Sequence, residues 1–306
     1  MNFPTLPGVF TASLTPLDSN LEPDLEALID HAMSLMEEGS DGVALLGSTG
    51  EANSLTLEQR LKIIENVPGS LSPEHLMLGT GSCSLQDAVV LTKASMLSGV
   101  WTVLVLPPFY YRPQSDDGAF RYFSEIIESV GDEKLRVVFY NFPQLSGYSF
   151  SIEILLKLRE RFGPTAAGIK DSSGDWENMK RVANEIPDFS VYAGTERFLL
   201  DVLREGGAGC ITATGNLTSP GCREVYRAWR AGDQEEAEGA QERLTRQRLV
   251  LQNHPFVSGL KSLTRLKTGS SVWCNMLPPF VPLSDDNAAL FAREAAETGL
   301  DVPASG

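Results

Sequence analysis

Residues 165–175 read TAAGIKDSSGD, a short apolar run that ends in Lys170 and then breaks into small polar residues. An apolar run of this length, bounded by polar residues, is typical of a buried strand. Lysine belongs in water, because an unpaired buried ammonium carries a large desolvation cost. Lys170 is therefore either a surface lysine whose amine reaches solvent or an amine kept at the end of a strand to react with a carbonyl.

Strand and helix patterns alternate on both sides of this stretch. Strand patterns are predicted at residues 9–14, 42–46, 76–78, 102–106, 136–140, 166–170, 190–193 and 208–212, and a helical pattern follows each. Strands that alternate with helices imply a parallel sheet. Eight such units favour a (β/α)8 barrel over an open doubly wound sheet, which usually has fewer strands.

Capping signals mark the starts of several predicted helices. Thr56 with Gln59 forms a capping box, and Ser84 precedes another helical pattern. The pair Ser219-Pro220 predicts that the last barrel helix begins there, with proline in its first turn. We expect residues 1–230 to form the barrel that carries the active site. Residues 231–306 are predicted to form a C-terminal helical extension used in packing or assembly.

Composition excludes several classes of function. The net charge of −15 argues against nucleic acid or an anionic membrane as a partner, and it means that an anionic substrate needs a local positive site. The four cysteines form no CxxC pair and the three histidines are far apart, so no metal site is predicted. With neither a signal-peptide pattern nor a membrane-spanning run, we expect a soluble, cytoplasmic protein.

Unusual polar residues follow the predicted strands, where a barrel of this kind places its active site. Ser48 and Thr49 follow the second strand, Tyr110 the fourth, Tyr140 the fifth and Lys170 the sixth. Four strand ends that deliver hydroxyls and an amine to one face favour the reactive interpretation of the lysine.

Each of these motifs also has a plainer interpretation. Residues 47–51, GSTGE, offer backbone N–H groups for a carboxylate or phosphate, or form an ordinary strand-to-helix turn. Tyr140 is either a buried tyrosine with a satisfied hydroxyl or a proton relay beside another hydroxyl such as that of Ser48. Tyr110, which follows a Pro-Pro pair, is typical of an interface.

These residues resemble the dihydrodipicolinate synthase / N-acetylneuraminate lyase family of pyruvate-handling class I aldolases, over essentially the whole chain. The similar segments are residues 47–51, 108–111, 140–143, 168–170 and 207–213. The resemblance implies a (β/α)8 barrel with C-terminal helices, assembled as a homotetramer or dimer. It also implies a covalent imine on the lysine, with no separate cofactor.

Carried over by position, the resemblance assigns a role to each residue. Lys170 forms the Schiff base with pyruvate or another 2-oxo acid. Ser48 and Thr49 hold the carboxylate, Tyr140 is the acid–base group, and Tyr110 completes a hydroxyl relay from a neighbouring subunit. Ile211 lends a backbone carbonyl near the bound pyruvate.

The branch of the family is a separate question. The synthase branch has an arginine where this chain has Leu145, so a clamp on the second substrate's carboxylate is missing. Residues 145–147 and 172–175 resemble the lyase branch, and Ser172 is placed where the distal part of a substrate would lie. After strand seven, Gly194 and Glu196 match substrate-binding positions and Glu196 keeps one hydroxyl contact. Arg197 replaces an acid there.

We therefore expect a lyase or aldolase that joins or separates pyruvate and an aldehyde, on a 2-oxo-3-deoxy sugar acid or an N-acetylneuraminate-like substrate. Arg197 and Ala213 suggest a shorter or more acidic substrate than sialic acid, although Arg197 pairing on the surface is an equal alternative. Other readings are a dihydrodipicolinate synthase, a 2-oxo-3-deoxy sugar-acid dehydratase, and a non-catalytic barrel that binds 2-oxo acids.

Overall fold

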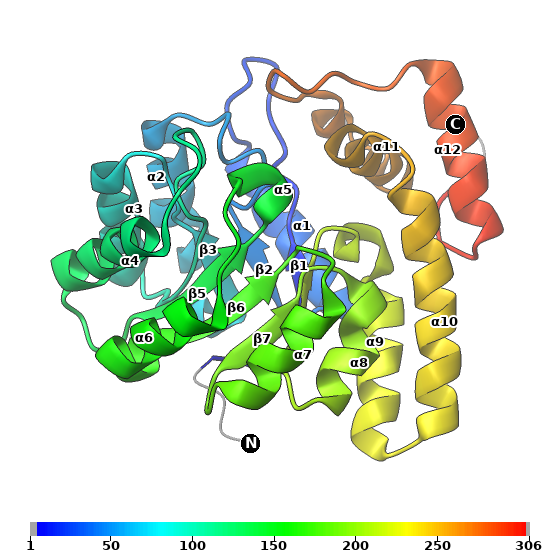
Figure 1. Ribbon diagram of the computed structural model, residues 1–306. Helices are drawn as coiled ribbons and strands as arrows, with labels where there is room; N and C mark the ends of the chain where they lie inside the picture. Colours follow the sequence, from blue (N-terminus) through cyan, green and yellow to red (C-terminus); the bar gives the residue numbers. More distant parts are fainter. Residues whose placement is uncertain (1–4, 304–306) are drawn as a thin grey trace.

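The computed structural model describes residues 5–303 and shows a closed barrel of eight parallel strands (Figure 1). Neighbouring strands pair in chain order, and the last strand closes the barrel by pairing with the first. The strands are β1 (Gly8–Ala12), β2 (Gly42–Leu45), β3 (Leu76–Gly79), β4 (Thr102–Val105), β5 (Arg136–Asn141), β6 (Ala166–Asp171), β7 (Ser190–Ala193) and β8 (Gly209–Thr212). The predicted (β/α)8 barrel is confirmed.

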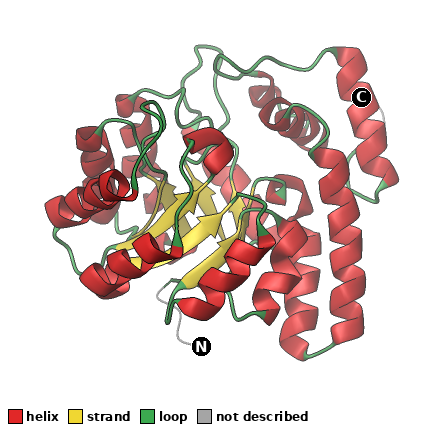
Figure 2. Ribbon diagram, in the orientation of Figure 1, coloured by secondary structure: helices red, strands yellow, loops and turns green. Residues whose placement is uncertain are grey.

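Helices surround the strands, as Figure 2 shows in red around the yellow sheet. The helices that follow the strands in turn are α1 (Leu25–Glu38), α2 (Leu57–Asn66), α3 (Leu85–Leu97), α4 (Asp116–Val130), α6 (Ile152–Phe162), α7 (Trp176–Glu185), α8 (Leu199–Arg204) and α9 (Gly215–Ala231). A short helix, α5 (Pro143–Ser146), lies in the loop after β5. The 3-10 turns are η1 (Val67–Gly69), η2 (Pro73–His75), η3 (Gly163–Thr165), η4 (Glu196–Phe198) and η5 (Ser271–Cys274).

Three more helices follow the barrel: α10 (Gln234–Leu251), α11 (Phe256–Thr268) and α12 (Asp285–Glu297). In Figure 1, α10 runs alongside α9, and α11 and α12 lie on the same side of the barrel. The expected C-terminal helices are therefore present. The division into separate units at residues 230 and 231 stays a prediction. Within residues 5–303, no helix combines the length and apolarity needed to cross a bilayer.

The capping signals show where local sequence controls the helix starts. Thr56 Oγ1 accepts from the Gln59 amide at 3.1 Å, and Gln59 Oε1 accepts from the Thr56 amide at 3.0 Å, which completes the predicted capping box. Ser84 caps α3 as expected, by accepting from the Asp87 amide. Each such bond satisfies a backbone N–H that has no partner inside the helix.

The start predicted at Ser219-Pro220 is wrong. The helix begins at Gly215 and contains Pro220. Asn216 explains the earlier start: its side chain donates to the Ala12 carbonyl at 2.9 Å and accepts from the Leu14 amide at 3.2 Å. These bonds fix the first turn of α9 to the end of β1. They offset the one helical hydrogen bond that a proline cannot donate.

A buried histidine makes the stability of this fold depend on pH. His31 on α1 has its Nε2 2.8 Å from Asn216 Oδ1, and its ring packs against Trp273. Burial lowers the pKa of His31 from 6.5 to about 4, an effect that the Asn216 bond only partly opposes. Between pH 6.5 and about pH 4, the unfolded chain therefore binds a proton at this histidine that the folded chain does not bind. The contribution of neutral His31 to the free energy of unfolding is therefore fully present above pH 6.5 and is lost as the pH falls towards 4.

We expect this titration to remove about 2–3 kcal/mol between pH 7.5 and pH 4.5, from a pKa difference of a little over two units. Urea unfolding of the wild type and His31→Gln at both pH values measures it. The difference in the free energy of unfolding between the wild type and His31→Gln should be smaller by that amount at pH 4.5 than at pH 7.5. His75→Gln, at a more exposed histidine, serves as the control. A gap between wild type and His31→Gln that is independent of pH would contradict the assignment.

Candidate active site

A cavity of about 640 Å³ lies at the carboxyl ends of the strands. Among the residues predicted from sequence, those that line it are Ser48, Thr49, Tyr140, Lys170, Ser172, Gly194 and Arg197. They come from the ends of β5 and β6 and from the loops after β2, β6 and β7. The closed barrel thus brings together residues that are up to 149 positions apart (197 minus 48) in the chain.

Lys170 and Tyr140 are neighbours in the lining of this cavity. They are in register on the paired strands β5 and β6, so their side chains emerge on the same face. The Nζ atom of Lys170 is 4.2 Å from the centre of the Tyr140 ring. Both side chains are buried, with 4% of Lys170 and 6% of Tyr140 exposed.

The Lys170 amine has no counter-ion in the described part of the chain. Among residues 5–303, Nζ of Lys170 has no carboxylate within ion-pair distance and no hydrogen-bond partner. A buried amine without a counter-ion is destabilising for the fold. Its place in a cavity beside the Tyr140 ring fits an amine that reacts with a carbonyl, as the sequence motif suggested.

The loop after β2 presents backbone N–H groups to the same cavity. Gly50 N donates to the Gly47 carbonyl at 3.1 Å, and Glu51 N donates to the Ser48 carbonyl at 3.3 Å, which closes the loop on itself. In the described part of the chain, the amides of Ser48 and Thr49 have no acceptor. Free amides beside hydroxyls form a site for an oxyanion such as a carboxylate.

The residues that follow Tyr140 and Lys170 hold the two strand ends together. Asp171 Oδ2 accepts from the side-chain amides of Asn141 and Asn178, both at 3.0 Å. Its Oδ1 accepts from the Ser173 amide at 2.8 Å. Asp171 is 1% exposed and points away from the cavity-lining set. The Asn and Asp of these motifs therefore position the tyrosine and lysine rather than contact a substrate.

Ser172 and Gly194 form the rim between β6 and β7. The Gly194 amide donates to the Asp171 carbonyl at 2.7 Å, so the two strand ends are in close contact. A Cβ atom at position 194 would collide with the Ser172 hydroxyl. The glycine is therefore needed for this approach, and it leaves the hydroxyl of Ser172 at the cavity.

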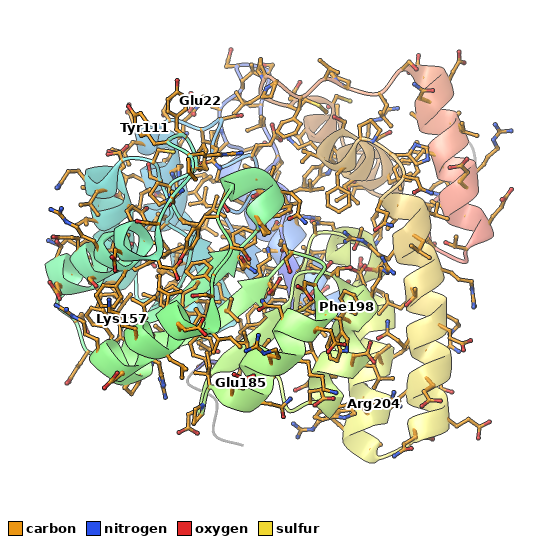
Figure 3. All side chains as sticks on the ribbon, in the orientation of Figure 1. Glu22, Tyr111, Lys157, Glu185, Phe198 and Arg204 are labelled. Carbon is orange, nitrogen blue, oxygen red and sulfur yellow. The ribbon has the colours of Figure 1, made fainter. Side chains whose placement is uncertain are left out.

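Arg197 also faces the cavity, at the start of η4. In the described chain its guanidinium has no carboxylate within 4.0 Å, and it lies 5.8 Å from the ring of Phe198, which Figure 3 labels beside α8. The alternative of a surface ion pair for Arg197 is therefore not supported. An unpaired cation at the cavity suits an anionic group on a ligand.

Glu196 requires a correction. Its carboxylate is fully buried and accepts hydrogen bonds from Thr212, Thr214 and Thr218 and from Arg248. It is absent from the cavity lining. A carboxylate whose oxygens all accept hydrogen bonds from the protein is not free to bind a substrate hydroxyl. The structure therefore contradicts the expected contact between Glu196 and the substrate. Glu196 instead ties η4 to β8, α9 and α10.

Tyr110 and Ile211 do not line the cavity either. Tyr110 is 76% exposed on the loop after β4, in edge-on contact with Tyr111, which Figure 3 labels at the periphery of the molecule. Ile211 is buried in β8, paired with Phe10 of β1. Within the described chain, no hydrogen bond joins the hydroxyls of Ser48 and Tyr140. The relay through Tyr110 and the carbonyl contact of Ile211 stay predictions.

One wall of the cavity was not predicted from the sequence. Residues from the C-terminal region also line the cavity: Arg248, Gln252, Phe256, Val257 and Phe280. The extension is therefore part of the site and not only an appendage for assembly. One signal was present, since Arg248 falls in the apolar stripe of α10 formed by Ala237, Ala240, Leu244 and Leu251. A charged residue in a buried stripe indicates a buried partner, here Glu196.

The charges at the cavity have one sign. Its described lining contains the cations Lys170, Arg197 and Arg248 and no Asp or Glu. Arg248 pairs with Glu196 at 3.4 Å, whereas Lys170 and Arg197 have no carboxylate partner in residues 5–303. In a chain with a net charge of −15, this is the local positive site that an anionic substrate requires. No cluster of three or more His, Cys, Asp or Glu side chains suited to a metal ion occurs in residues 5–303.

Comparison with known proteins shows the family to which the chain belongs. Residues 5–297 match the dihydrodipicolinate synthetase family. An uncharacterized DapA-like lyase from Chloroflexus aurantiacus is 31% identical over 289 residues, with 92% of this chain and 93% of that protein covered. A 4-hydroxy-tetrahydrodipicolinate synthase from Methanopyrus kandleri is 29% identical, with 96% of each chain covered.

Solved structures agree with these relatives. The structure of YagE, a prophage protein of the dihydrodipicolinic acid synthase family from E. coli K12 in complex with pyruvate, superposes with a TM-score of 0.89 at 26% identity, over 96% of this chain and 99% of that one. Dihydrodipicolinate synthase from Agrobacterium tumefaciens gives 0.83 at 28% identity, over 96% and 99%. The chain therefore belongs to the dihydrodipicolinate synthetase family and is a lyase or aldolase of that family.

Proposed function

We propose that this protein is a class I lyase or aldolase that forms an imine between Lys170 and pyruvate and that acts on a 2-oxo-3-deoxy sugar acid. The observation that carries the proposal is the buried Lys170 amine, which lies 4.2 Å from the Tyr140 ring and has no ion-pair partner among the described residues. It lies in a cavity of about 640 Å³, a size typical of small-molecule sites. The pyruvate complex of YagE supports the choice of 2-oxo acid.

The reaction starts at the amine. Nitrogen of Lys170 attacks the keto carbon, and water leaves as the imine forms. The protonated imine then accepts the electron pair of the carbon–carbon bond that breaks, which yields an enamine and an aldehyde. Protonation of the enamine carbon and addition of water to the imine release pyruvate and the free lysine.

The neighbouring groups have separate tasks in this scheme. The free amides of Ser48 and Thr49 hold the carboxylate of the 2-oxo acid. The Tyr140 hydroxyl moves the proton at the imine and at the substrate hydroxyl, and a neutral phenol does so without a fixed charge beside the iminium. The hydroxyls of Ser48 and of Tyr110 from a neighbouring subunit complete the proton relay.

The residue at position 145 favours the lyase branch over the synthase branch. Leu145 lines the cavity where a synthase would place an arginine. The Arg112 guanidinium donates to the carbonyls of Phe109 and Leu145 and is not among the cavity-lining residues. Arg197 and Ser172, which line the cavity, are suited to an anionic and hydroxylated aldehyde portion.

A second candidate is a 4-hydroxy-tetrahydrodipicolinate synthase, because several relatives at about the same identity carry that name. This enzyme would condense pyruvate with aspartate semialdehyde on the same lysine. The missing arginine argues against it. Coupled turnover of the two substrates is the direct test of this candidate.

The main proposal is tested by incubating the enzyme with a panel of 2-oxo-3-deoxy sugar acids and following the release of pyruvate. Cleavage of at least one of them, with no turnover of aspartate semialdehyde, is the expected result. A product that keeps every carbon would indicate dehydration instead. Absence of pyruvate release from the whole panel, together with turnover of aspartate semialdehyde, would establish the synthase.

Arg197→Gln is expected to raise KM for an acidic substrate by about 10- to 100-fold, as for the loss of one hydrogen bond to a charged group. Retro-aldol cleavage of two substrates that differ only in a terminal carboxylate or alcohol measures this. The alcohol should show little change, because it gains nothing from the cation. Arg181→Gln, on the exposed face of α7, is the matched control. An equal change in KM for both substrates would contradict the assignment.

The homotetramer or dimer and the cytoplasmic location stay predictions. The exposed Tyr110 and Tyr111 support assembly through the loop after β4. Sedimentation of the wild type and of a Tyr111→Glu variant would measure the assembly.

A further inference from the structure

Behind the wall contributed by the C-terminal region, α11 carries a buried charged residue that the proposed mechanism does not use. Lys261 on α11 is fully buried, and its Nζ forms an ion pair with Glu51 at the end of the Ser48–Thr49 loop. Nζ also donates to the Asn275 carbonyl at 2.8 Å. Lysine falls here in a stripe of buried residues on α11 that includes Val257 and Thr264.

Glu51 is held equally firmly. It is 2% exposed, and its Oε2 accepts from the Leu277 amide at 2.7 Å. Its backbone has φ +58°, a left-handed conformation that a residue with a Cβ atom rarely adopts without support from its surroundings. The Glu51 amide donates to the Ser48 carbonyl, so the conformation of Glu51 is linked directly to the carboxylate-binding amides.

Further bonds run between the barrel loops and residues 275–278, which we call the C-terminal strap. Ser54 Oγ donates to the Pro278 carbonyl at 3.0 Å. Asn275 Nδ2 donates to the Leu17 carbonyl at 2.9 Å, in the loop after β1. The strap therefore contacts the loop of residues 47–55 at Glu51 and Ser54, and it contacts the loop after β1 at Leu17.

We infer that Lys261 and Glu51 are positioning residues, which set the geometry of the Ser48–Thr49 amides and thereby the affinity for the carboxylate of the 2-oxo acid. The inference rests on the proposed function for the identity of the ligand, but the link between α11 and the loop stands on the contacts alone. Neither side chain lines the cavity, so the pair acts through the loop and not on the substrate.

The alternative is that the pair only stabilises the fold. Burial lowers the pKa of Lys261, and the Glu51 carboxylate opposes that shift. Removal of either partner leaves a buried charge uncompensated, which by itself destabilises a protein. A test must therefore separate loop geometry from global stability. Replacing both partners removes the uncompensated charge, so the double variant Glu51→Gln/Lys261→Met is the informative one.

A matched control lies on the same helix. Lys267 pairs with Glu38 of α1 at 2.6 Å and is partly exposed. Lys267→Met removes one lysine and one ion pair from α11 without touching the loop after β2. Melting temperature of each variant, in the full-length protein, shows how much global stability each change removes.

Amide hydrogen exchange measures how readily the loop of residues 47–55 opens, and it does so in the absence of any ligand. In the double variant we expect the amides of residues 47–55 to exchange at least about ten-fold faster than in the wild type, while those of α2 and α7 keep their rates. Lys267→Met should leave the loop unchanged. Equal loop exchange in the folded double variant and the wild type overturns the inference.

Pyruvate saturation of borohydride labelling measures the functional consequence. The half-saturating pyruvate concentration should rise about 10- to 100-fold in the double variant, as expected for a binding group displaced by about an ångström, with the labelling at saturation still complete. An unchanged half-saturation in the folded variant also overturns the inference. If wild-type protein is not labelled at all, the imine proposal fails, and the exchange experiment still decides the role of Lys261 and Glu51.

Discussion

Sodium borohydride added together with pyruvate is expected to attach a three-carbon unit to Lys170 and to no other lysine. The imine carbon accepts hydride, and the product is a stable secondary amine that remains on the peptide. The selectivity follows from the structure, because this amine is buried in the cavity, has no ion-pair partner among the described residues and lies beside Tyr140. Peptide mass spectrometry locates the label.

Replacement of the same residue should remove catalysis. We expect Lys170→Met to abolish labelling and to lower turnover by at least about 10⁴-fold, since loss of a covalent nucleophile elsewhere costs about 10⁶-fold. The fold should survive, because a buried ammonium without a counter-ion is replaced by an apolar chain of similar length. Lys180→Met, on the exposed face of α7, is the control. Absence of the label from Lys170 in active wild-type enzyme would contradict the imine mechanism.

The second large effect concerns the proton. Tyr140→Phe is expected to lower turnover by about 10²–10⁴-fold, the usual contribution of a general acid–base group, while the melting temperature stays close to that of the wild type. The ring remains in place against Phe142 and above the lysine, so packing is preserved. Only the hydroxyl, which has no protein partner in the described chain, is lost.

Tyr148→Phe is the matched control for this experiment. The Tyr148 side chain is buried, and its hydroxyl donates to Oδ1 of the exposed Asp116 at 2.8 Å, away from the cavity. Its loss removes a partly buried hydrogen bond without touching the site. Turnover near the wild-type value in Tyr148→Phe, with a large drop in Tyr140→Phe, supports the assignment. If Tyr140→Phe retains wild-type turnover, another group moves the proton.

Much of the fold was predictable because its signals are local. Each strand is a short apolar run bounded by polar residues, and caps such as Thr56 act within one helical turn. The wrong helix start at Ser219-Pro220 shows the limit of this reasoning. Proline is a local signal, but Asn216 bonds to the end of β1, more than 200 residues earlier, and those bonds decided where α9 begins.

The candidate site divides in the same way. Lys170, Tyr140, Ser48 and Thr49 were found because strand ends of a parallel barrel meet at one face, so the order of strands alone brings them together. Glu196 was misjudged because its sequence neighbours do not show that three threonines and Arg248 surround it. Its environment is made by three other elements.

The sequence by itself therefore predicted the barrel and the strand-end residues around Lys170, because periodicity and strand order are properties of the local chain. Its resemblance to a known family predicted the chemical class. Only the tertiary structure decided that the C-terminal helices supply a wall of the cavity, that Glu196 is closed off from it, and that Lys261 forms an ion pair with Glu51 of the loop after β2. The physical reason is that a buried charge requires a partner, and the partner's identity depends on which distant surfaces pack together.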